Sequence, residues 1–134
     1  MREGRLHLKV VTPVRVVVDT EADEVTLPGA LGALGILPGH APLLATLAIG
    51  ELSYRTATRE YYLAVQRGFV KVASDVVTVL ADVAELPAEI DVEAARAEKL
   101  AAEGALRAAA GKEFEHQRAH LEAAVTRITV ATRR

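Results

Sequence analysis

The most informative segment of the chain is Gly32-Ala33-Leu34-Gly35-Ile36-Leu37-Pro38-Gly39-His40-Ala41-Pro42-Leu43-Leu44. Two glycines flank a short apolar segment, Pro38-Gly39 can then turn the chain, and His40-Ala41-Pro42 leads into a second apolar run. Taken by itself, this pattern predicts a β-turn between two strands of a sandwich.

Short β-branched runs recur on both sides of this segment. Leu6, Leu8 and Val10 alternate with the residues between them, as in a half-buried strand. Nine strands are expected, near residues 6–11, 14–18, 24–27, 34–37, 44–49, 51–58, 60–65, 69–73 and 76–81. Ser74-Asp75 predicts a hairpin turn, and Gln66-Arg67-Gly68 predicts another. Because no helical pattern intervenes, an antiparallel sandwich or barrel is favoured.

The composition changes near Pro87. All five prolines and seven of nine glycines lie at or before this residue, whereas 14 of the 47 residues after it are alanine. We therefore expect a β-sandwich domain over residues 1–86 and a helical hairpin over residues 87–134. Asp91 is the expected N-cap of the first helix, and Gly111 the break before a second helix that begins at Lys112.

The two predicted helices differ in amphipathicity. The second has an apolar face formed by Phe114, Leu121, Val125 and Ile128. In the first, Leu100 and Leu106 lie about 240° apart around the helix axis, with alanines between them. Such a helix has little apolar contrast, so we expect the hairpin to dock weakly on the sandwich.

The overall composition excludes several functional classes. The chain has 134 residues and no cysteine, which excludes disulfides and thiolate chemistry, and its net charge of −2 gives no attraction to nucleic acid. No apolar run is long enough to cross a membrane, and Met1 is not followed by a secretory signal. We expect a cytosolic chain, or one peripheral on the cytosolic face of a membrane.

Three histidines are candidates for metal binding or acid–base chemistry. His116 and His120 are four residues apart, a spacing that can hold a metal ion, but no third ligand is evident and an exposed helix face is favoured. His40 lacks a serine, cysteine or carboxylate at a suitable spacing, so we expect a turn histidine that faces a partner. No catalytic constellation is readable, and a stand-alone enzyme is the poorest hypothesis.

The segment 32–44 resembles the GxLGIxPGHAPL motif of the ε subunit of F-type ATP synthases, which is called δ in mitochondria. Further matches follow in the family's order: Val10–Pro13, Gly68–Val72 with Arg67 in place of a glycine, Val77–Asp82, and Glu89–Asp91 before the alanine-rich hairpin. The resemblance covers nearly the whole chain.

This resemblance implies a ten-stranded β-sandwich followed by two antiparallel helices. It implies a non-catalytic rotor subunit of the central stalk, which couples proton translocation to ATP synthesis and restrains ATP hydrolysis when the hairpin extends. The implied partners are the γ subunit, the c-subunit ring and the α and β subunits. The implied location is the cytoplasmic face of a bacterial plasma membrane, with a thylakoid membrane as the alternative.

The resemblance also implies partner contacts. Leu37, Pro38, Gly39 and His40 match the loop that approaches the c-ring, although Ala33 replaces an acidic residue frequent in the family. Arg118 and Arg127 match the hairpin positions that meet an acidic segment of β in the extended form. Whether the hairpin rests folded or extended is left open by the sequence, because a few kcal/mol decide it.

Several bacterial relatives bind ATP through an I/L-D-x-x-R-A segment, which Val92–Ala97 resembles with Glu93 in place of aspartate. Glu93, Arg96 and Arg127 are the nucleotide ligands that this implies, and no other cofactor is expected. Two further basic positions of the family fall on Glu103 and Ala123, which predicts weak binding or none. An exposed helical ion pair of Glu93 with Arg96 is the simpler interpretation. The alternative functions are an ATP-sensing regulator and an unrelated sandwich adaptor for a helical partner.

Overall fold

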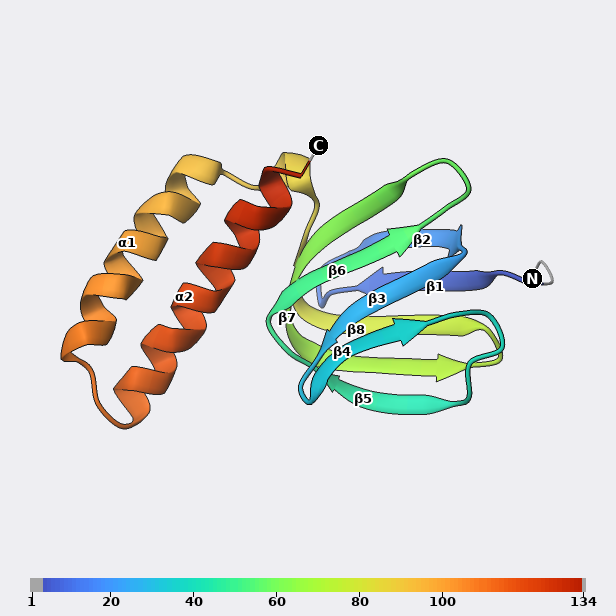
Figure 1. Cartoon of the computed structure of the whole chain (residues 1–134), viewed down its shortest axis with the longest axis horizontal. Coiled ribbons are helices and arrows are strands. Elements are labelled where there is room, and N and C mark those ends of the chain that lie inside the picture. The colour runs from blue at the N-terminus through green and yellow to red at the C-terminus, as the bar shows by residue number, and fades with distance from the viewer. Residues whose placement is uncertain (1–3, 134) are drawn as a thin grey trace.

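The computed structural model describes residues 4–133, which form a β-sandwich and a helical hairpin beside it (Figure 1). The strands are β1 (Leu6–Val11), β2 (Val16–Ala22), β3 (Glu24–Gly29), β4 (Gly32–Ile36), β5 (Leu43–Leu47), β6 (Gly50–Arg55), β7 (Glu60–Ala73) and β8 (Val76–Glu85). A 3₁₀ turn, η1 (Pro87–Glu89), leads to α1 (Val92–Ala108) and α2 (Lys112–Ala131).

The long strand β7 joins the two layers. The strands are ordered β2-β1-β8-β7-β5-β3-β4, and β6 pairs with both β3 and β7. The first part of β7 pairs with β6, and the second part with β5, so β5 and β6 lie end to end along it. Because β3 also contacts both β5 and β6, the sheet closes around one core.

The strand count corrects two expectations. The structure has eight strands over the described residues, where nine were read from the pattern and ten were implied by the resemblance. Gln66-Arg67-Gly68 is not a turn, because β7 continues through it with positive φ angles of 47° at Arg67 and 139° at Gly68. The neighbouring strand β8 hydrogen-bonds to β7 on both sides of Arg67, which keeps the two predicted strands in one line.

The sheet is mixed, not wholly antiparallel as expected. β1 and β8 pair in parallel, with His7 opposite Val76 and Val11 opposite Leu80. These strands stand at opposite ends of the sandwich sequence, so no short hairpin constrains their direction. β2 also begins at Val16, later than expected, because Val14 lies in an exposed turn that the Thr12 N–H closes by donating to the Arg15 carbonyl at 2.9 Å.

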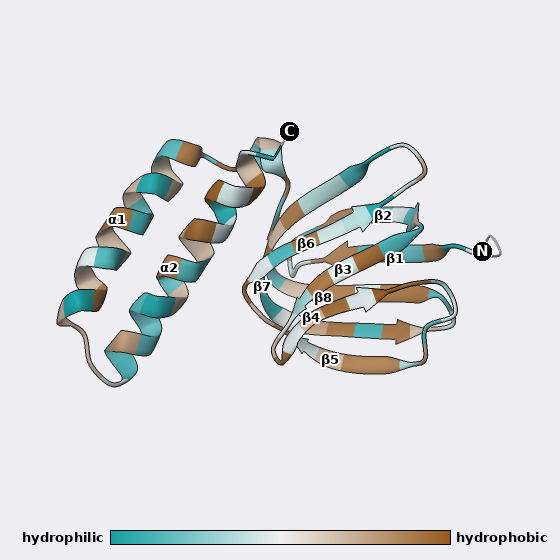
Figure 2. Ribbon diagram, viewed as in Figure 1, coloured by the Kyte–Doolittle hydropathy of each residue, from teal (hydrophilic) through white to brown (hydrophobic). Residues whose placement is uncertain are grey.

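Other predictions in the sandwich are confirmed. Leu6, Leu8 and Val10 are completely buried in a core of aliphatic side chains contributed by every strand. Ser74 and Asp75 have φ angles of 50° and 63°, as a tight hairpin turn between β7 and β8 requires. Figure 2 shows apolar residues alternating with polar ones along these strands.

The helices begin where the sequence predicts. The Asp91 carboxylate accepts a hydrogen bond of 3.0 Å from the Ala94 N–H and caps α1, and Gly111, with a φ of 60°, precedes α2. α2 lies between α1 and the sandwich (Figure 1).

The predicted apolar face of α2 is only partly covered, because Leu121 and Ile128 are half-buried. Phe114 and Val125 are exposed, whereas Ala124 and Val130 are buried. α2 is covered on two sides, by α1 and by the strands, and small side chains allow a close approach on the side of α1, which buries Ala95 and Ala102.

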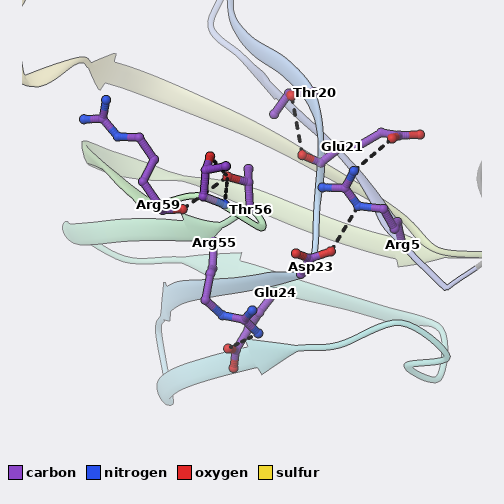
Figure 3. Close-up of polar contacts among 9 residues, drawn as sticks. Arg5, Thr20, Glu21, Asp23, Glu24, Arg55, Thr56 and Arg59 are labelled. Atoms are coloured by element: carbon purple, nitrogen blue, oxygen red, sulfur yellow. Dashed lines mark hydrogen bonds and ion pairs between the residues drawn. The ribbon is translucent and has the colours of Figure 1, made fainter.

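Surface ion pairs reinforce the sandwich. Arg5, just before β1, donates from Nε to Asp23 in the turn between β2 and β3 at 3.0 Å, and from Nη1 to Glu21 of β2 at 3.2 Å (Figure 3). Arg55 of β6 reaches Glu24 of β3 at 3.3 Å in the same view. These pairs lie within the sandwich and do not involve the helices.

Candidate functional site

The loop 37–40 lies at the surface of the sandwich, where hydrogen bonds close its turn. Its turn is closed by the His40 N–H, which donates to the Leu37 carbonyl at 3.1 Å. The Gly39 N–H donates to the Asp75 carboxylate at 2.7 Å, and Gly39 has a φ of 86° that favours glycine. The His40 Nδ1 lies 2.6 Å from the Ala41 carbonyl, which only accepts, so this nitrogen carries the proton. Leu37, Pro38, Gly39 and His40 therefore form a hydrogen-bonded turn at the surface, which we call the knuckle.

Glu93 and Arg96 lie in the first turns of α1 and pair with each other. The Arg96 Nη1 donates to the Glu93 carboxylate at 2.9 Å, and both side chains are more than half exposed. This is the exposed helical ion pair that the sequence offered as the simpler interpretation.

Arg127 has a different environment. Its guanidinium is largely buried at the junction of three elements, where it donates to Glu85 at the end of β8 and to Glu98 of α1. The cavity beside Arg127 is lined by Gln66, Val83, Glu85, Glu98, His120, Ala123, Ala124 and Arg127, and by neither Glu93 nor Arg96. The three residues proposed as nucleotide ligands are thus not brought together, and two carboxylates already neutralise Arg127.

Arg118 lies on an exposed part of α2. It pairs with Glu115 at 3.5 Å and Glu122 at 3.7 Å, both within its own helix. The same stretch of α2 borders an open cleft against Thr46, Phe69 and Asp82 of the sandwich. Arg118 is therefore accessible in the folded hairpin, whereas Arg127 is not.

His116 and His120 are both exposed, with ring centroids 4.5 Å apart in an edge-to-face arrangement. Over residues 4–133, no group of three or more histidine, aspartate or glutamate side chains is arranged to hold a metal ion. Within that range, too, neither helix has the length and apolar character needed to cross a bilayer.

The pairing of two other arginines at the junction was not predicted from the sequence. Arg133, just after α2, donates to both carboxylate oxygens of Glu51 at 2.9 and 2.7 Å, and its guanidinium lies 4.6 Å from the centre of the Tyr62 ring. Arg15 pairs at two points with Glu89 of η1, each at 2.7 Å. These pairs join residues 82 and 74 positions apart, and such long-range pairs leave no periodic signal in a single sequence.

The pair of Arg15 and Glu89 has an electrostatic consequence. The hydrogen bond from Arg15, assisted by the Leu86 N–H at 2.9 Å, lowers the pKa of Glu89 to about 2. The same pair raises the pKa of Arg15. Glu89 is therefore ionised at any physiological pH, and the linker between sandwich and hairpin stays attached to the turn before β2.

An apolar strip lies on the outer face of β5, β7 and β8. Leu44, Phe69 and Leu80 are 73%, 56% and 53% exposed. Phe69 lies directly opposite Leu80 in the β7–β8 pairing, and Leu44 lies two residues before Thr46, the β5 partner of Phe69. Large apolar side chains grouped in this way mark an interaction surface more often than isolated ones do. The sequence hinted at it through apolar residues at alternate positions on both faces of these strands.

Comparison with known proteins places these features in a family. Residues 5–87 match the model of the ATP synthase delta/epsilon chain β-sandwich domain. The chain is 47% identical over 131 residues to ATP synthase epsilon chain 2 of Syntrophotalea carbinolica, covering 96% of this chain and 95% of that one. It is 43% identical over 129 residues to the ATP synthase epsilon chain of Geobacter metallireducens, covering 95% and 94%.

Solved structures agree on the fold. A chain of the Euglena gracilis mitochondrial ATP synthase, from a structure of its F1 and c-ring, superposes with a TM-score of 0.84 at 18% identity, over 99% of this chain and 84% of that one. A chain from the central stalk and c-ring of the Tetrahymena thermophila enzyme gives 0.65 at 13% identity, over 98% and 100%. The fold, the sandwich match and the full-length relatives together show that this chain belongs to the ATP synthase delta/epsilon family.

Proposed function

We propose that this chain is a non-catalytic rotor subunit in the central stalk of an F1Fo ATP synthase, where it couples proton translocation to ATP synthesis. Full-length identity of 43–47% to ATP synthase epsilon chains carries this proposal. The geometry supports it through two exposed surfaces that a partner can contact, the apolar strip of Leu44, Phe69 and Leu80 and the turn of residues 37–40.

Two surfaces of the sandwich divide the partner contacts. The strip of Leu44, Phe69 and Leu80 faces the γ subunit, since its apolar area would otherwise stay in water. The knuckle of Leu37, Pro38, Gly39 and His40 faces the c-ring, and its hydrogen-bonded turn would lose little conformational entropy on binding. Ala33 provides no charge beside this second contact.

The hairpin restrains ATP hydrolysis when it extends toward the α and β subunits. Of the two arginines assigned to that step, Arg118 is available while the hairpin is folded, and Arg127 becomes available only when its pairs with Glu85 and Glu98 break. Contact with an acidic segment requires positive charges. In the folded state one of these two charges, that of Arg127, is already paired with carboxylates.

The surroundings of Arg127 argue against the ATP-sensing alternative. A nucleotide phosphate would have to displace Glu85 and Glu98, and the two other expected cations are absent at Glu103 and Ala123. We propose that the subunit needs no cofactor, and that it works as a peripheral component on the cytoplasmic side of a bacterial plasma membrane.

The test is reconstitution with the catalytic complex of α, β and γ lacking this subunit. The full chain and a version ending at Leu86, which is the proposed domain boundary, are each added, and association and ATP hydrolysis are measured. Association of both, with slower hydrolysis only for the full chain, supports an anchoring sandwich and a braking hairpin. Association without slower hydrolysis would mean that the subunit couples the two reactions but does not inhibit hydrolysis. Failure of the full chain to associate would contradict the proposal.

A further inference from the structure

The hairpin shares little apolar surface with the sandwich. α1 packs on α2 and not on the strands (Figure 1). The apolar contact between α2 and the sandwich is a small cluster of Ala64, Ile90 and Val130, with Tyr62 and Ala131 at its margin, separate from the sandwich core. Such a cluster stabilises docking far less than a continuous core would.

Arginine–carboxylate pairs also connect the hairpin to the sandwich. Arg127 donates from Nε and Nη2 to the two Glu85 oxygens at 2.9 and 3.2 Å, and from Nη1 to Glu98 at 2.6 Å. Arg133 makes a second two-point pair, with Glu51 of β6. Bidentate guanidinium–carboxylate pairs are both stronger and more directional than single hydrogen bonds.

Arg127 differs from Arg133 in joining three elements. It connects α2 to the sandwich through Glu85 and to α1 through Glu98, with 19% of its side chain exposed. When α2 lifts from the sandwich, Arg127 keeps only Glu98 and Glu85 loses its cation. Both hydrogen bonds between Arg127 and Glu85 are therefore lost together.

We propose that Arg127 and Arg133 form an electrostatic clasp that holds the hairpin on the sandwich and makes its release cooperative and dependent on ionic strength. The clasp is a property of the isolated chain, and its role in controlling hydrolysis rests on the function proposed above. Salt weakens the more exposed pair of Arg133 first, while Arg127 sets the threshold for release because its pair with Glu85 is less screened.

The absence of cysteine allows release to be measured by thiol labelling of the full chain. Ala64 is 1% exposed beneath Val130 and Ile90, so the thiol of an Ala64→Cys variant reacts only when the hairpin lifts. Ala81→Cys, at a position buried in the sandwich core, reacts only when the sandwich itself unfolds. Ala57→Cys, in the exposed turn between β6 and β7, gives the reference rate of a free thiol.

Alkylation rates are then compared in three backgrounds. Arg127→Gln is expected to accelerate labelling at Ala64→Cys by about tenfold and to leave Ala81→Cys within about twofold. Arg118→Gln is the matched control on the same helix, because its pairs stay within α2, and it should change neither rate. Raising NaCl from about 0.05 to about 1 M should accelerate Ala64→Cys in the otherwise native chain.

Equal Ala64→Cys rates in the Arg127→Gln and Arg118→Gln backgrounds would overturn the clasp, as would a rate independent of salt. If Arg127→Gln also accelerates Ala81→Cys strongly, the arginine stabilises the whole fold and the clasp is likewise refuted. Association with the catalytic complex is scored separately. A failed clasp with normal association leaves the proposed function standing, and the reverse result removes the function while the clasp remains.

Discussion

Arg127 of α2 and Glu85 at the end of β8 form a two-point ion pair across the junction between hairpin and sandwich, with only about a fifth of each side chain exposed. The residues are 42 positions apart in sequence. In a partly buried pair, removal of one side chain leaves the other charge uncompensated, which costs more than the loss of a hydrogen bond between neutral groups. Docking of the hairpin on the sandwich therefore depends on both side chains.

Replacing Glu85 with glutamine should destabilise the chain by about 1–2 kcal/mol, since Arg127 keeps Glu98 but loses its two-point partner. Urea unfolding followed by circular dichroism measures this change. Glu93→Gln is the control, because the exposed pair with Arg96 should contribute less than about 0.5 kcal/mol. Equal effects of the two substitutions would show that burial of the first pair has no energetic consequence.

The pair of Arg15 and Glu89 predicts a pH dependence. The pKa of Glu89 is about 2 in the folded chain against an ordinary value of 4.5, so the folded state binds this proton less readily than the unfolded state. The stabilisation is fully present above about pH 4.5 and is lost as the pH falls toward about 2. Glu89→Gln should therefore lower stability at pH 7, and its difference from the native chain should close over that range. Thermal unfolding at a series of pH values measures it, and a constant difference down to pH 2 would be inconsistent with the pair.

The sequence predicted the parts of this fold that depend on local pattern. Alternating Leu6, Leu8 and Val10, the turn at Ser74-Asp75, and the helix ends at Asp91 and Gly111 are all encoded within a few neighbouring residues. The continuity of β7 was missed because β8 decides it from a distant part of the chain.

The junction was hidden for the same reason. Arg127 was identified through a family position, but its partners Glu85 and Glu98, and the pair of Arg133 with Glu51, depend on three-dimensional proximity alone. The buried face of α2 also depends on what covers it. The helical periodicity of α2 alone places Phe114 and Val125 on its apolar face, but in this fold the approach of α1 and the strands buries Ala124 and Val130.

Gly68 should not tolerate a side chain. A Cβ at this position would lie 1.8 Å from the Leu80 carbonyl oxygen, and the φ of 139° is unfavourable for any other residue. Gly68→Ala is expected to cost about 3 kcal/mol or more in unfolding free energy, because β8 must move to make room. Gly35→Ala is the control, since nothing lies within 4 Å of its added methyl group. A Gly68→Ala chain as stable as Gly35→Ala would mean that β7 and β8 do not approach closely there.

The apolar strip should govern association with the stalk without governing stability. A lysine in place of Phe69 or Leu80 puts a charge where the partner needs an apolar contact, and we expect affinity for the catalytic complex with γ to fall by at least about tenfold. The unfolding free energy should change by less than about 1 kcal/mol, because both side chains already face water.

Leu100→Lys is the matched control, as Leu100 is 71% exposed on α1, away from the strip, and should leave affinity unchanged. Equilibrium binding with a labelled chain separates the outcomes. If Phe69→Lys and Leu80→Lys bind as tightly as Leu100→Lys, the γ subunit docks elsewhere and the strip has another partner.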